Sequence, residues 1–411
     1  MKVLMLHNCY RQPGGEDTVF QAEARLLRDH GIEVLDVEFD NQVHGESPLP
    51  GTVRLALESA WSDSSHAEVS RLCREFRPDV AHIHNFWMRL SPSAHAACQQ
   101  AGVPVVQTLH NFRLLCVNSN LLRDGRVCED CLGGGPWRGV LHRCYRDSLV
   151  ASAVMARMIA SSRRRAWDQY VDAFVVLSRH CQAKFNAASL PPERMFVKAN
   201  FMADPGPPAG RPSASNVMVY AGRLSQEKGV RSLLDGWACG RLSSLGRLLI
   251  VGDGEDRAAL QRHAASLGLE EPGVTFAGWK TRAEVQSLVA SSRAVAVPSI
   301  CYETSPMSVV EAYAAGRPVV AADHGSMSET VHQGRTGWKF PVAQPGPMAE
   351  ALREALLDDA LADRLGRGAR AEYLAHYTPE RNFEVLMGIY RFAVERRGKT
   401  LPDGAPIAAC R

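Results

Sequence analysis

Residues 2–38, KVLMLHNCYRQPGGEDTVFQAEARLLRDHGIEVLDVE, predict a strand, a loop, a helix and a second strand. The apolar run at residues 2–7 predicts a buried strand, residues 18–30 predict a helix, and residues 32–38 predict a second strand. Strand, helix and strand in this order form a βαβ unit, in which the two strands are parallel. The opening of the chain therefore predicts an α/β fold with a parallel sheet.

The same alternation continues through the first half of the chain. Further buried strands are predicted at residues 79–84, 103–110 and 173–178, each followed by polar or helical sequence, as in a parallel sheet covered on both faces. Residues 204–215, DPGPPAGRPSAS, have the composition of a linker. Residues 1–203 are therefore predicted to form an N-terminal, doubly wound, Rossmann-like domain.

After the linker the pattern restarts. Strands are predicted at residues 217–221, 248–251, 274–277, 294–298 and 319–322. Residues 216–375 are thus predicted to form a second Rossmann-like domain, and residues 376–411 a C-terminal helical tail, with a break in the helices near residues 377–379. Two such domains are expected to face a cleft at the carboxyl ends of their strands, where ligands of doubly wound folds bind.

The composition excludes several classes of protein. The chain has 411 residues, of which 45% are hydrophobic and 22% charged, as expected for a soluble protein of two domains. A net charge of +3 argues against extensive nucleic-acid binding. Because the N-terminus soon becomes polar and no stretch reaches ~18 uninterrupted apolar residues, we expect a cytoplasmic chain without a membrane span. Eleven cysteines, an odd number, predict reduced thiols.

The strongest chemical signal is the stretch 303–311, ETSPMSVVE, which follows a predicted strand. A helix that begins near Pro306 directs its free N–H groups and positive dipole end toward the cleft, where a phosphate or a sugar hydroxyl would bind well. Glu303, ahead of this helix, can accept hydrogen bonds from sugar hydroxyls, and Glu311 can bind a ribose diol. The alternative is a capped helix with a solvated glutamate.

A second signal is the stretch 221–229, AGRLSQEKG, at the end of the first strand of the second domain. Arg223 and Lys228 flank a turn there. A guanidinium and an ammonium at such a turn can neutralise a diphosphate leaving group. A solvated basic loop is the alternative interpretation.

The N-terminal domain contributes two further candidates. Gly14 and Gly15 lie between the first strand and the first helix, where glycine lets backbone approach a ligand closely, although a tight turn explains them equally well. His110 ends a predicted strand, which places it at the edge of the expected cleft. It is the candidate for the residue nearest the reacting carbon, and a structural histidine is the alternative.

Taken together, these residues resemble the family-4 retaining glycosyltransferases of the GT-B fold. Glu303 and Glu311 are similar to that family's E-x7-E motif, and Gly222-Arg223 with Lys228 is similar to its G-R-x4-K element. The resemblance covers most of the chain and is weaker in the N-terminal half.

The resemblance implies transfer of a sugar from a UDP- or GDP-type sugar to an acceptor hydroxyl, with retained anomeric configuration. Arg223 and Lys228 would stabilise the departing diphosphate, Glu303 would bind the sugar and Glu311 the ribose, and His110 would position the sugar or the acceptor. The donor site would also include Gly14, Gly15, Thr304, Ser305, Pro306 and Met307. No cofactor is expected for the chemistry, and the sequence contains no Asp-x-Asp.

Other classes of protein remain as alternatives. A GT-B-like epimerase or phosphorylase would use a similar cleft, and a non-catalytic sugar-nucleotide-binding protein would carry the same binding residues. A dehydrogenase is disfavoured, because neither glycine-rich turn has the complete dinucleotide fingerprint.

Four cysteines cluster in an insertion at about residues 111–147. The four are Cys116, Cys128, Cys131 and Cys144. Cys128 and Cys131 form a Cys-x2-Cys core, and the two outer cysteines lie at similar distances along the sequence on either side of it. This spacing suggests one structural zinc held by four thiolates, and free buried thiols are the alternative.

A basic segment follows. Between residues 138 and 165 there are seven arginines and one acid, Asp147; the arginines are Arg138, Arg143, Arg146, Arg157, Arg163, Arg164 and Arg165. Leu149, Val150, Val154, Met155, Met158 and Ile159 fall mostly on one side of a helix. Such a helix can bind an anionic membrane surface, which agrees with a lipid-linked glycan acceptor in surface polysaccharide synthesis. A core helix with a solvated basic face is the alternative.

Overall fold

The chain folds into two compact units. The computed structural model describes residues 1–9, 14–40, 58–269 and 271–401, apart from the side chains of residues 163–168. Unit 1 contains residues 1–121, 128–199 and those from Glu380 onward, and unit 2 contains residues 122–127 and 200–379. The last helix of the chain therefore belongs to unit 1.

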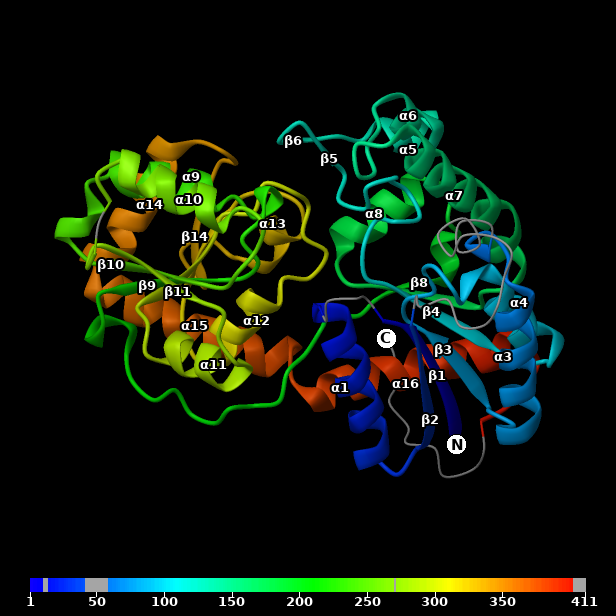
Figure 1. Cartoon of the computed structure of the whole chain (residues 1–411). Helices are drawn as coiled ribbons and strands as arrows, with labels where there is room; N and C mark the ends of the chain where they lie inside the picture. The colour runs from blue at the N-terminus through cyan, green and yellow to red at the C-terminus, as the bar shows by residue number, and fades with distance from the viewer. Residues whose placement is uncertain (10–13, 41–57, 270, 402–411) are drawn as a thin grey trace. The chain divides into compact units, whose positions relative to one another are not determined.

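Unit 1 is built on a six-stranded sheet in the order β2-β1-β3-β4-β7-β8, in which every neighbouring pair is parallel (Figure 1). The strands are β1 (Lys2–Asn8), β2 (Glu33–Phe39), β3 (Val80–Ile83), β4 (Val105–Leu109), β7 (Ala173–Val176) and β8 (Met195–Val197). β3, β4 and β7 are buried along their whole length. Continuous apolar runs form such strands because helices exclude water from both faces of the sheet.

Helices connect the strands of unit 1, the final helix of the chain joins the same unit, and an insertion follows β4. They are α1 (Gly15–Asp29), α3 (Asp63–Phe76), α4 (Ser91–Gln100), α7 (Leu149–Gln169), α8 (Arg179–Ala187) and the final helix α16 (Pro379–Arg396). The insertion holds the short helices α5 (Asp130–Gly134) and α6 (Trp137–Leu141) and the antiparallel pair β5 (Leu122–Arg123) and β6 (Arg126–Val127), whose residues group with unit 2.

Unit 2 repeats the architecture with the sheet order β11-β10-β9-β12-β13-β14, again parallel throughout. Its strands are β9 (Val217–Ala221), β10 (Arg247–Val251), β11 (Val274–Gly278), β12 (Ala294–Val297), β13 (Val319–Ala322) and β14 (Gly337–Phe340). Its helices are α9 (Val230–Cys239), α10 (Arg257–Ser266), α11 (Arg282–Ala290), α12 (Met307–Ala314), α13 (Ser326–Thr330), α14 (Pro345–Leu357) and α15 (Asp359–His376). Trp237 and Trp338 are fully buried in its core.

The predicted fold class, two doubly wound parallel-sheet domains followed by helices, is confirmed. The predicted break near residues 377–379 separates α15 from α16. Four strands were not predicted: β8 and β14, which lie at sheet edges and have only three and four residues, and the two-residue strands β5 and β6 of the insertion. Among the described residues, none of the helices has both the length and the apolar content that crossing a membrane requires.

Candidate active site

Two loops of unit 2 meet at the carboxyl ends of adjacent strands. Lys228 lies on the loop after β9 and Glu303 on the loop after β12, and these two strands pair in the sheet. The Nζ of Lys228 donates a hydrogen bond of 2.7 Å to the Oε1 of Glu303. The structure thus shows a direct hydrogen bond between Lys228, which the sequence assigned to the diphosphate of a donor, and Glu303, which it assigned to the sugar.

Glu303 is held as a carboxylate. Its Oε1 also accepts a hydrogen bond of 2.6 Å from the Oγ of Ser299. Burial by itself raises the pKa of Glu303, but the Lys228 ammonium and these hydrogen bonds outweigh burial and place the pKa below its ordinary value. Burial likewise opposes the charge of Lys228, whereas Glu303 raises the pKa of Lys228 above its ordinary value. At neutral pH the two groups therefore form a charged, mostly buried pair.

The backbone around Lys228 fits closely against the loop of Glu303. Gly229, directly after Lys228, has a φ of +70°, and a Cβ there would lie 2.0 Å from the carbonyl oxygen of Pro298. The backbone N–H of Ile300 donates a hydrogen bond of 2.9 Å to the carbonyl oxygen of Glu227. Only glycine permits both this φ and this approach, so Gly229 fixes the distance between the two loops.

Arg223 lies on the same loop as Lys228, with an exposed side chain. The Tyr220 hydroxyl donates a hydrogen bond of 2.7 Å to the Arg223 carbonyl oxygen, which fixes the backbone there. The guanidinium is therefore on a fixed backbone while its charged end faces water. This arrangement allows Arg223 to engage an anion that arrives from solvent.

The predicted helix after Glu303 is α12, which begins at Met307 with Pro306 as its cap residue. Thr304 and Ser305 precede it and are partly exposed. Glu311 is partly buried within the helix; burial raises its pKa, and Arg282 of α11 opposes that rise. The predicted position of the helix start is correct to within one residue.

His324 is a candidate that sequence reasoning missed. It follows β13, and its Nε2 donates a hydrogen bond of 2.8 Å to the carbonyl oxygen of Ser299, the residue whose hydroxyl bonds to Glu303. Burial lowers the pKa of His324, so the ring is neutral at pH 7. Its position just after a strand, the same signal that singled out His110, could have identified it.

In unit 1, Gly14 is the N-cap residue of α1 and Gly15 is the first residue of that helix. The N–H of Gly14 donates a hydrogen bond of 2.6 Å to the Oδ2 of Asp17, so this N–H already has a partner in the protein. A Cβ at Gly15 would meet no described atom within 4 Å. The absence of described atoms within 4 Å of a Cβ at Gly15 agrees with close approach of a ligand, whereas Gly14 caps the helix.

His110 directly follows β4 and is 8% exposed. Its Nε2 lies 3.0 Å from the Nδ1 of His84, which directly follows β3. Burial lowers the pKa of His110 well below its ordinary value, so the ring is neutral at pH 7. Next to it, the Asn111 amide donates a hydrogen bond of 2.7 Å to the Oε1 of Glu16 on α1.

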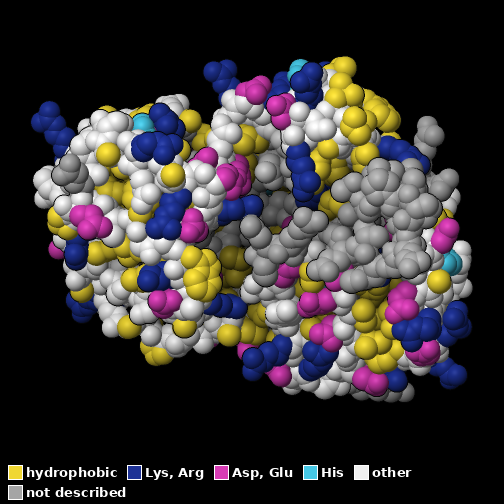
Figure 2. All heavy atoms as spheres, in the orientation of Figure 1, with side chains coloured by type: hydrophobic (Ala, Val, Ile, Leu, Met, Phe, Trp, Pro, Cys, Tyr) yellow, Lys and Arg dark blue, Asp and Glu magenta, His cyan; other side chains and the backbone are white. Residues whose placement is uncertain are grey.

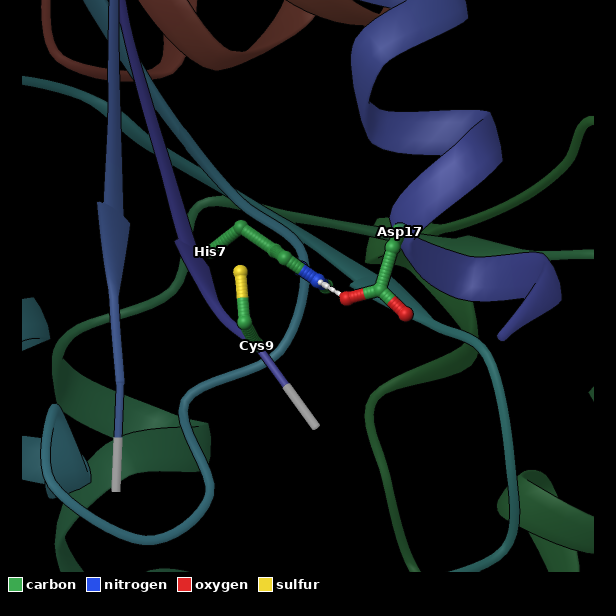
Figure 3. A group of neighbouring side chains, drawn as sticks. All are labelled: His7, Cys9 and Asp17. Atoms are coloured by element: carbon green, nitrogen blue, oxygen red, sulfur yellow. Dashed lines mark hydrogen bonds and ion pairs between the residues drawn. The ribbon is translucent and has the colours of Figure 1, made fainter. Parts of the chain in front are cut away.

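Two groups of described residues bring three possible metal ligands within 4.8 Å of one another: His7, Cys9 and Asp17, and Glu23, His82 and His84. In the first group the Nε2 of His7 donates a hydrogen bond of 2.8 Å to Asp17, as Figure 3 shows. Burial, with the nearby Glu38, raises the pKa of Cys9 to about 12, which keeps the thiol protonated. In the second group the ammonium of Lys198 already contacts Glu23.

The four predicted zinc ligands lie near one another without forming such a group. Cys116 and Cys131 are buried, and Cys128 and Cys144 are partly exposed. Cys131 and Cys144 both act electrostatically on Cys116, but no three of the four sulfurs lie within 4.8 Å of one another. The Sγ of Cys116 instead donates a hydrogen bond of 2.9 Å to Asn118. Zinc binding stays a prediction.

Three apolar side chains of the basic segment, Met155, Met158 and Ile159, are buried in unit 1, as in the alternative interpretation of a core helix. Membrane binding by this segment stays a prediction. The side chains of Arg163, Arg164 and Arg165 lie outside the described residues. Four large apolar side chains are exposed instead around α6 and the start of α7: Trp137, Leu141, Leu149 and Val150. Figure 2 shows hydrophobic and basic side chains together over this region.

The sequence matches two family models, one for each half of the chain. Residues 3–200 match "Glycosyl transferase 4-like domain", and residues 207–372 match "Glycosyl transferases group 1". The chain belongs to the family-4 glycosyltransferases. The resemblance inferred from the motifs at Arg223, Lys228, Glu303 and Glu311 is thereby confirmed at the level of the family.

Relatives of this glycosyltransferase include enzymes named for sugar transfer. The alpha-D-kanosaminyltransferase of Streptomyces kanamyceticus is 25% identical, with 84% of this chain and 86% of that protein aligned. The 2-deoxystreptamine N-acetyl-D-glucosaminyltransferase of Streptomyces fradiae is 26% identical, over 96% of this chain and 98% of that protein.

Solved structures show the fold. Anabaena HepE, in complex with UDP, has a TM-score of 0.65 at 21% identity and covers 95% of this chain and 99% of its own. The sucrose-phosphate synthase of Thermosynechococcus elongatus has a TM-score of 0.68 at 17% identity, covering 95% of this chain and 98% of its own. The architecture of this glycosyltransferase is accordingly GT-B.

Proposed function

We propose that this glycosyltransferase moves a sugar from a nucleoside-diphosphate sugar, of the UDP or GDP type, to an acceptor hydroxyl with retention of anomeric configuration. The observation that carries the proposal is the Lys228–Glu303 pair at the ends of β9 and β12, with Arg223 on the same loop as Lys228. Structures of HepE with UDP and with UDP-glucose share this fold, which supports a nucleotide sugar as donor.

In the proposed reaction the bond between the anomeric carbon and the diphosphate oxygen breaks, and a bond from the acceptor oxygen to the same carbon forms on the same face. The acceptor proton passes to the departing phosphate oxygen, so the products are the glycoside and the nucleoside diphosphate. Arg223 and Lys228 stabilise the negative charge that develops on the diphosphate, without requiring a metal ion. His110, neutral at pH 7, positions the sugar or the acceptor rather than acting as a strong base.

We assign each of the remaining residues to a part of the donor. Glu303 binds the sugar hydroxyls and Glu311 the ribose, while Thr304, Ser305, Pro306 and Met307 line the phosphate and sugar, and Gly14 and Gly15 leave room for the donor. Nucleoside diphosphate affinity tests this division. Glu311→Ala is expected to weaken that affinity, whereas Glu303→Ala is expected to lower turnover with a smaller effect on nucleoside diphosphate binding. Equal loss of affinity in both variants would contradict it.

For the acceptor we propose a lipid-linked glycan of surface polysaccharide synthesis, reached by a cytoplasmic enzyme bound peripherally to an anionic membrane. The support is the exposed apolar set Trp137, Leu141, Leu149 and Val150 beside Arg138, Arg143 and Arg146. Apolar side chains that enter the interface and arginines that attract anionic headgroups together hold a soluble protein at a bilayer.

A donor screen tests the proposal as a whole. Binding of UDP- and GDP-sugars to the full chain would be measured first, followed by product analysis with lipid-linked glycans and with soluble acceptors such as aminocyclitols. Transfer to soluble acceptors alone would overturn the lipid-linked proposal, and donor hydrolysis or epimerisation without transfer would overturn the transferase proposal. Elemental analysis of the same preparation tests for one zinc ion at Cys116, Cys128, Cys131 and Cys144.

A further inference from the structure

One group of side chains in unit 1 has no role in the function proposed so far. It lies where β1 ends and α1 begins, and it consists of His7 in the last turn of sequence of β1, Cys9 directly after that strand, and Asp17 in the first turn of α1. One ligand atom from each side chain lies within 4.8 Å of the other two. Figure 3 shows the three side chains together at this junction.

The backbone brings the three side chains together without a ligand. His7 and Cys9 are two positions apart, and side chains at this spacing in extended backbone point to the same face of a sheet. The N–H of Cys9 donates a hydrogen bond of 2.7 Å to the Phe39 carbonyl oxygen, so contact with β2 continues to this residue. Asp17 is fixed by the N–H of Gly14, 2.6 Å from its Oδ2, and by the Nε2 of His7, 2.8 Å from its Oδ1.

These three side chains offer the donor atoms that zinc prefers. Zn²⁺ binds imidazole nitrogen, thiolate sulfur and carboxylate oxygen, usually four ligands in a tetrahedron, and bonds of that length place ligand atoms about 3.3–3.6 Å apart. The separation of 2.8 Å between His7 and Asp17 and the upper limit of 4.8 Å for the group are within about 1 Å of those values. Small side-chain shifts therefore suffice to bring the three atoms onto one ion.

The surroundings of Cys9 are negatively charged, which favours a cation. The Sγ of Cys9 donates a hydrogen bond of 3.2 Å to the Oε2 of Glu38 on β2, so a second carboxylate faces the thiol. Burial and the acids Glu38, Asp17 and Asp40 raise the pKa of Cys9 to about 12, so the thiol keeps its proton until another cation replaces it. Arg89 lies 3.8 Å from Asp40 and offsets part of this negative charge.

We propose that His7, Cys9 and Asp17 form a zinc site, with a fourth position left for water. On binding, bonds form from Zn²⁺ to an imidazole nitrogen, to the Cys9 sulfur and to an Asp17 oxygen, and the thiol proton passes to solvent. The site belongs to unit 1, whereas Lys228 and Glu303 belong to unit 2. The inference goes beyond the proposed sugar transfer and does not rest on it.

The direct test is a titration of the full, reduced, metal-free chain with Co²⁺, followed by displacement with Zn²⁺. A thiolate bound to Co²⁺ gives a charge-transfer absorption, and we expect Cys9→Ser to remove this signal for one equivalent of metal. Asp17→Asn should weaken Zn²⁺ binding at this site at least about tenfold, because even the loss of a residue that only supports a ligand typically weakens metal binding about 10–100-fold.

Two controls separate this site from other cysteines. Cys239→Ser removes an exposed thiol of unit 2 and should leave the titration unchanged. Cys116→Ser removes a predicted ligand of the zinc site in the insertion and should leave the signal that depends on Cys9 in place. A wild-type chain without a thiolate-to-cobalt signal, or a signal that Cys9→Ser leaves unchanged, would overturn the proposal.

Thermal unfolding gives a second readout, independent of the absorption. Zn²⁺ stabilises a chain that binds it in the folded state, so it should raise the melting temperature. In chains that also carry Cys116→Ser, the rise should be larger with Asp17 than with Asp17→Asn, and without metal the two should both unfold cooperatively. An equal rise in both chains would also overturn the proposal.

Discussion

Lys228 and Glu303 depend on one another. Each is mostly buried, and each has the other as its charged partner at 2.7 Å. Removing one leaves the other as an uncompensated buried charge, which typically costs about 3–5 kcal/mol for fully buried pairs and less here, because both side chains retain some exposure. A diphosphate that binds Lys228 must therefore share the ammonium with Glu303.

The first prediction concerns the two cations. Arg223→Ala and Lys228→Ala should each lower kcat by about 10²–10³-fold, because each removes a preorganised group that stabilises charge on the leaving diphosphate. Arg223→Ala should leave the melting temperature unchanged, since its side chain is exposed, whereas Lys228→Ala should lower it. Steady-state kinetics and thermal unfolding measure both effects. Wild-type turnover in both variants would contradict the assignment.

The second prediction is an acid dependence of stability. The folded state lowers the pKa of Glu303 below its ordinary value of 4.5, so the pair's contribution is present above that pH and is lost as the pH falls through the folded pKa. Glu303→Gln lacks this contribution. The difference in unfolding free energy between wild type and Glu303→Gln, from urea titrations at pH 7 and in acid, should shrink as the pH falls. A difference that stays constant with pH would show that protonation of Glu303 is not linked to folding.

The sequence could predict these residues but not their pairing. Arg223, Lys228, Glu303 and Glu311 follow predicted strands, and their spacing is that of known motifs. Seventy-five positions separate Lys228 from Glu303, and only the order of β9 and β12 in the sheet brings them together. Likewise, spacing alone suggested four zinc ligands, but spacing does not give the distances between their sulfurs, no three of which lie within 4.8 Å of one another; zinc binding stays a prediction.

Among the elements, the loop after β9 depends on a single glycine. Gly229→Ala should destabilise unit 2 by about 1–3 kcal/mol, because the added Cβ would lie 2.0 Å from the Pro298 carbonyl oxygen. It should also lower donor affinity by displacing Lys228. Gly346→Ala is the control, since its Cβ would meet no described atom within 4 Å. Equal stability of the two variants, from urea unfolding, would show that the loop adapts without strain.

The exposed surface around α6 and the start of α7 yields the next prediction. Leu149→Ser with Val150→Ser, and separately Arg143→Gln with Arg146→Gln, should weaken co-sedimentation with anionic vesicles, and binding should fall as salt rises. Leu357→Ser with Leu374→Ser is a matched control, because those side chains are equally apolar and exposed but lie in unit 2. Binding that ignores lipid charge, salt and these variants would leave a soluble acceptor as the better proposal.

Element boundaries show why sequence prediction stops where it does. The long apolar runs of β1 and β4 could be predicted from the sequence, because a strand buried on both faces of a sheet is apolar along most of its length. β8 and β14 are short edge strands whose composition differs little from that of a loop. The helix pattern over residues 149–159 was visible too, but periodicity does not reveal whether its apolar face meets protein or membrane.

At the scale of the whole molecule, the last helix of the chain belongs to the same unit as the first residues of the chain. α16 packs into unit 1, where Tyr390 contacts His82 and Asn382 lies beside Lys198. The sequence predicted a helix there, but an amphipathic pattern does not identify the surface against which the helix packs. Two buried polar side chains of unit 1, His82 and Lys198, thus have partners on the final helix.

The central claim is retaining transfer from a nucleoside-diphosphate sugar, and the configuration of the product tests it most directly. The full chain would be incubated with UDP- and GDP-sugars and the acceptors of the donor screen, in the presence of a chelator. Proton NMR would then report the anomeric configuration of the glycoside, together with the amount of nucleoside diphosphate released. We predict an α-glycoside from an α-configured donor, with one nucleoside diphosphate per glycoside. A β-glycoside, or release of nucleoside diphosphate without any glycoside, would contradict the account.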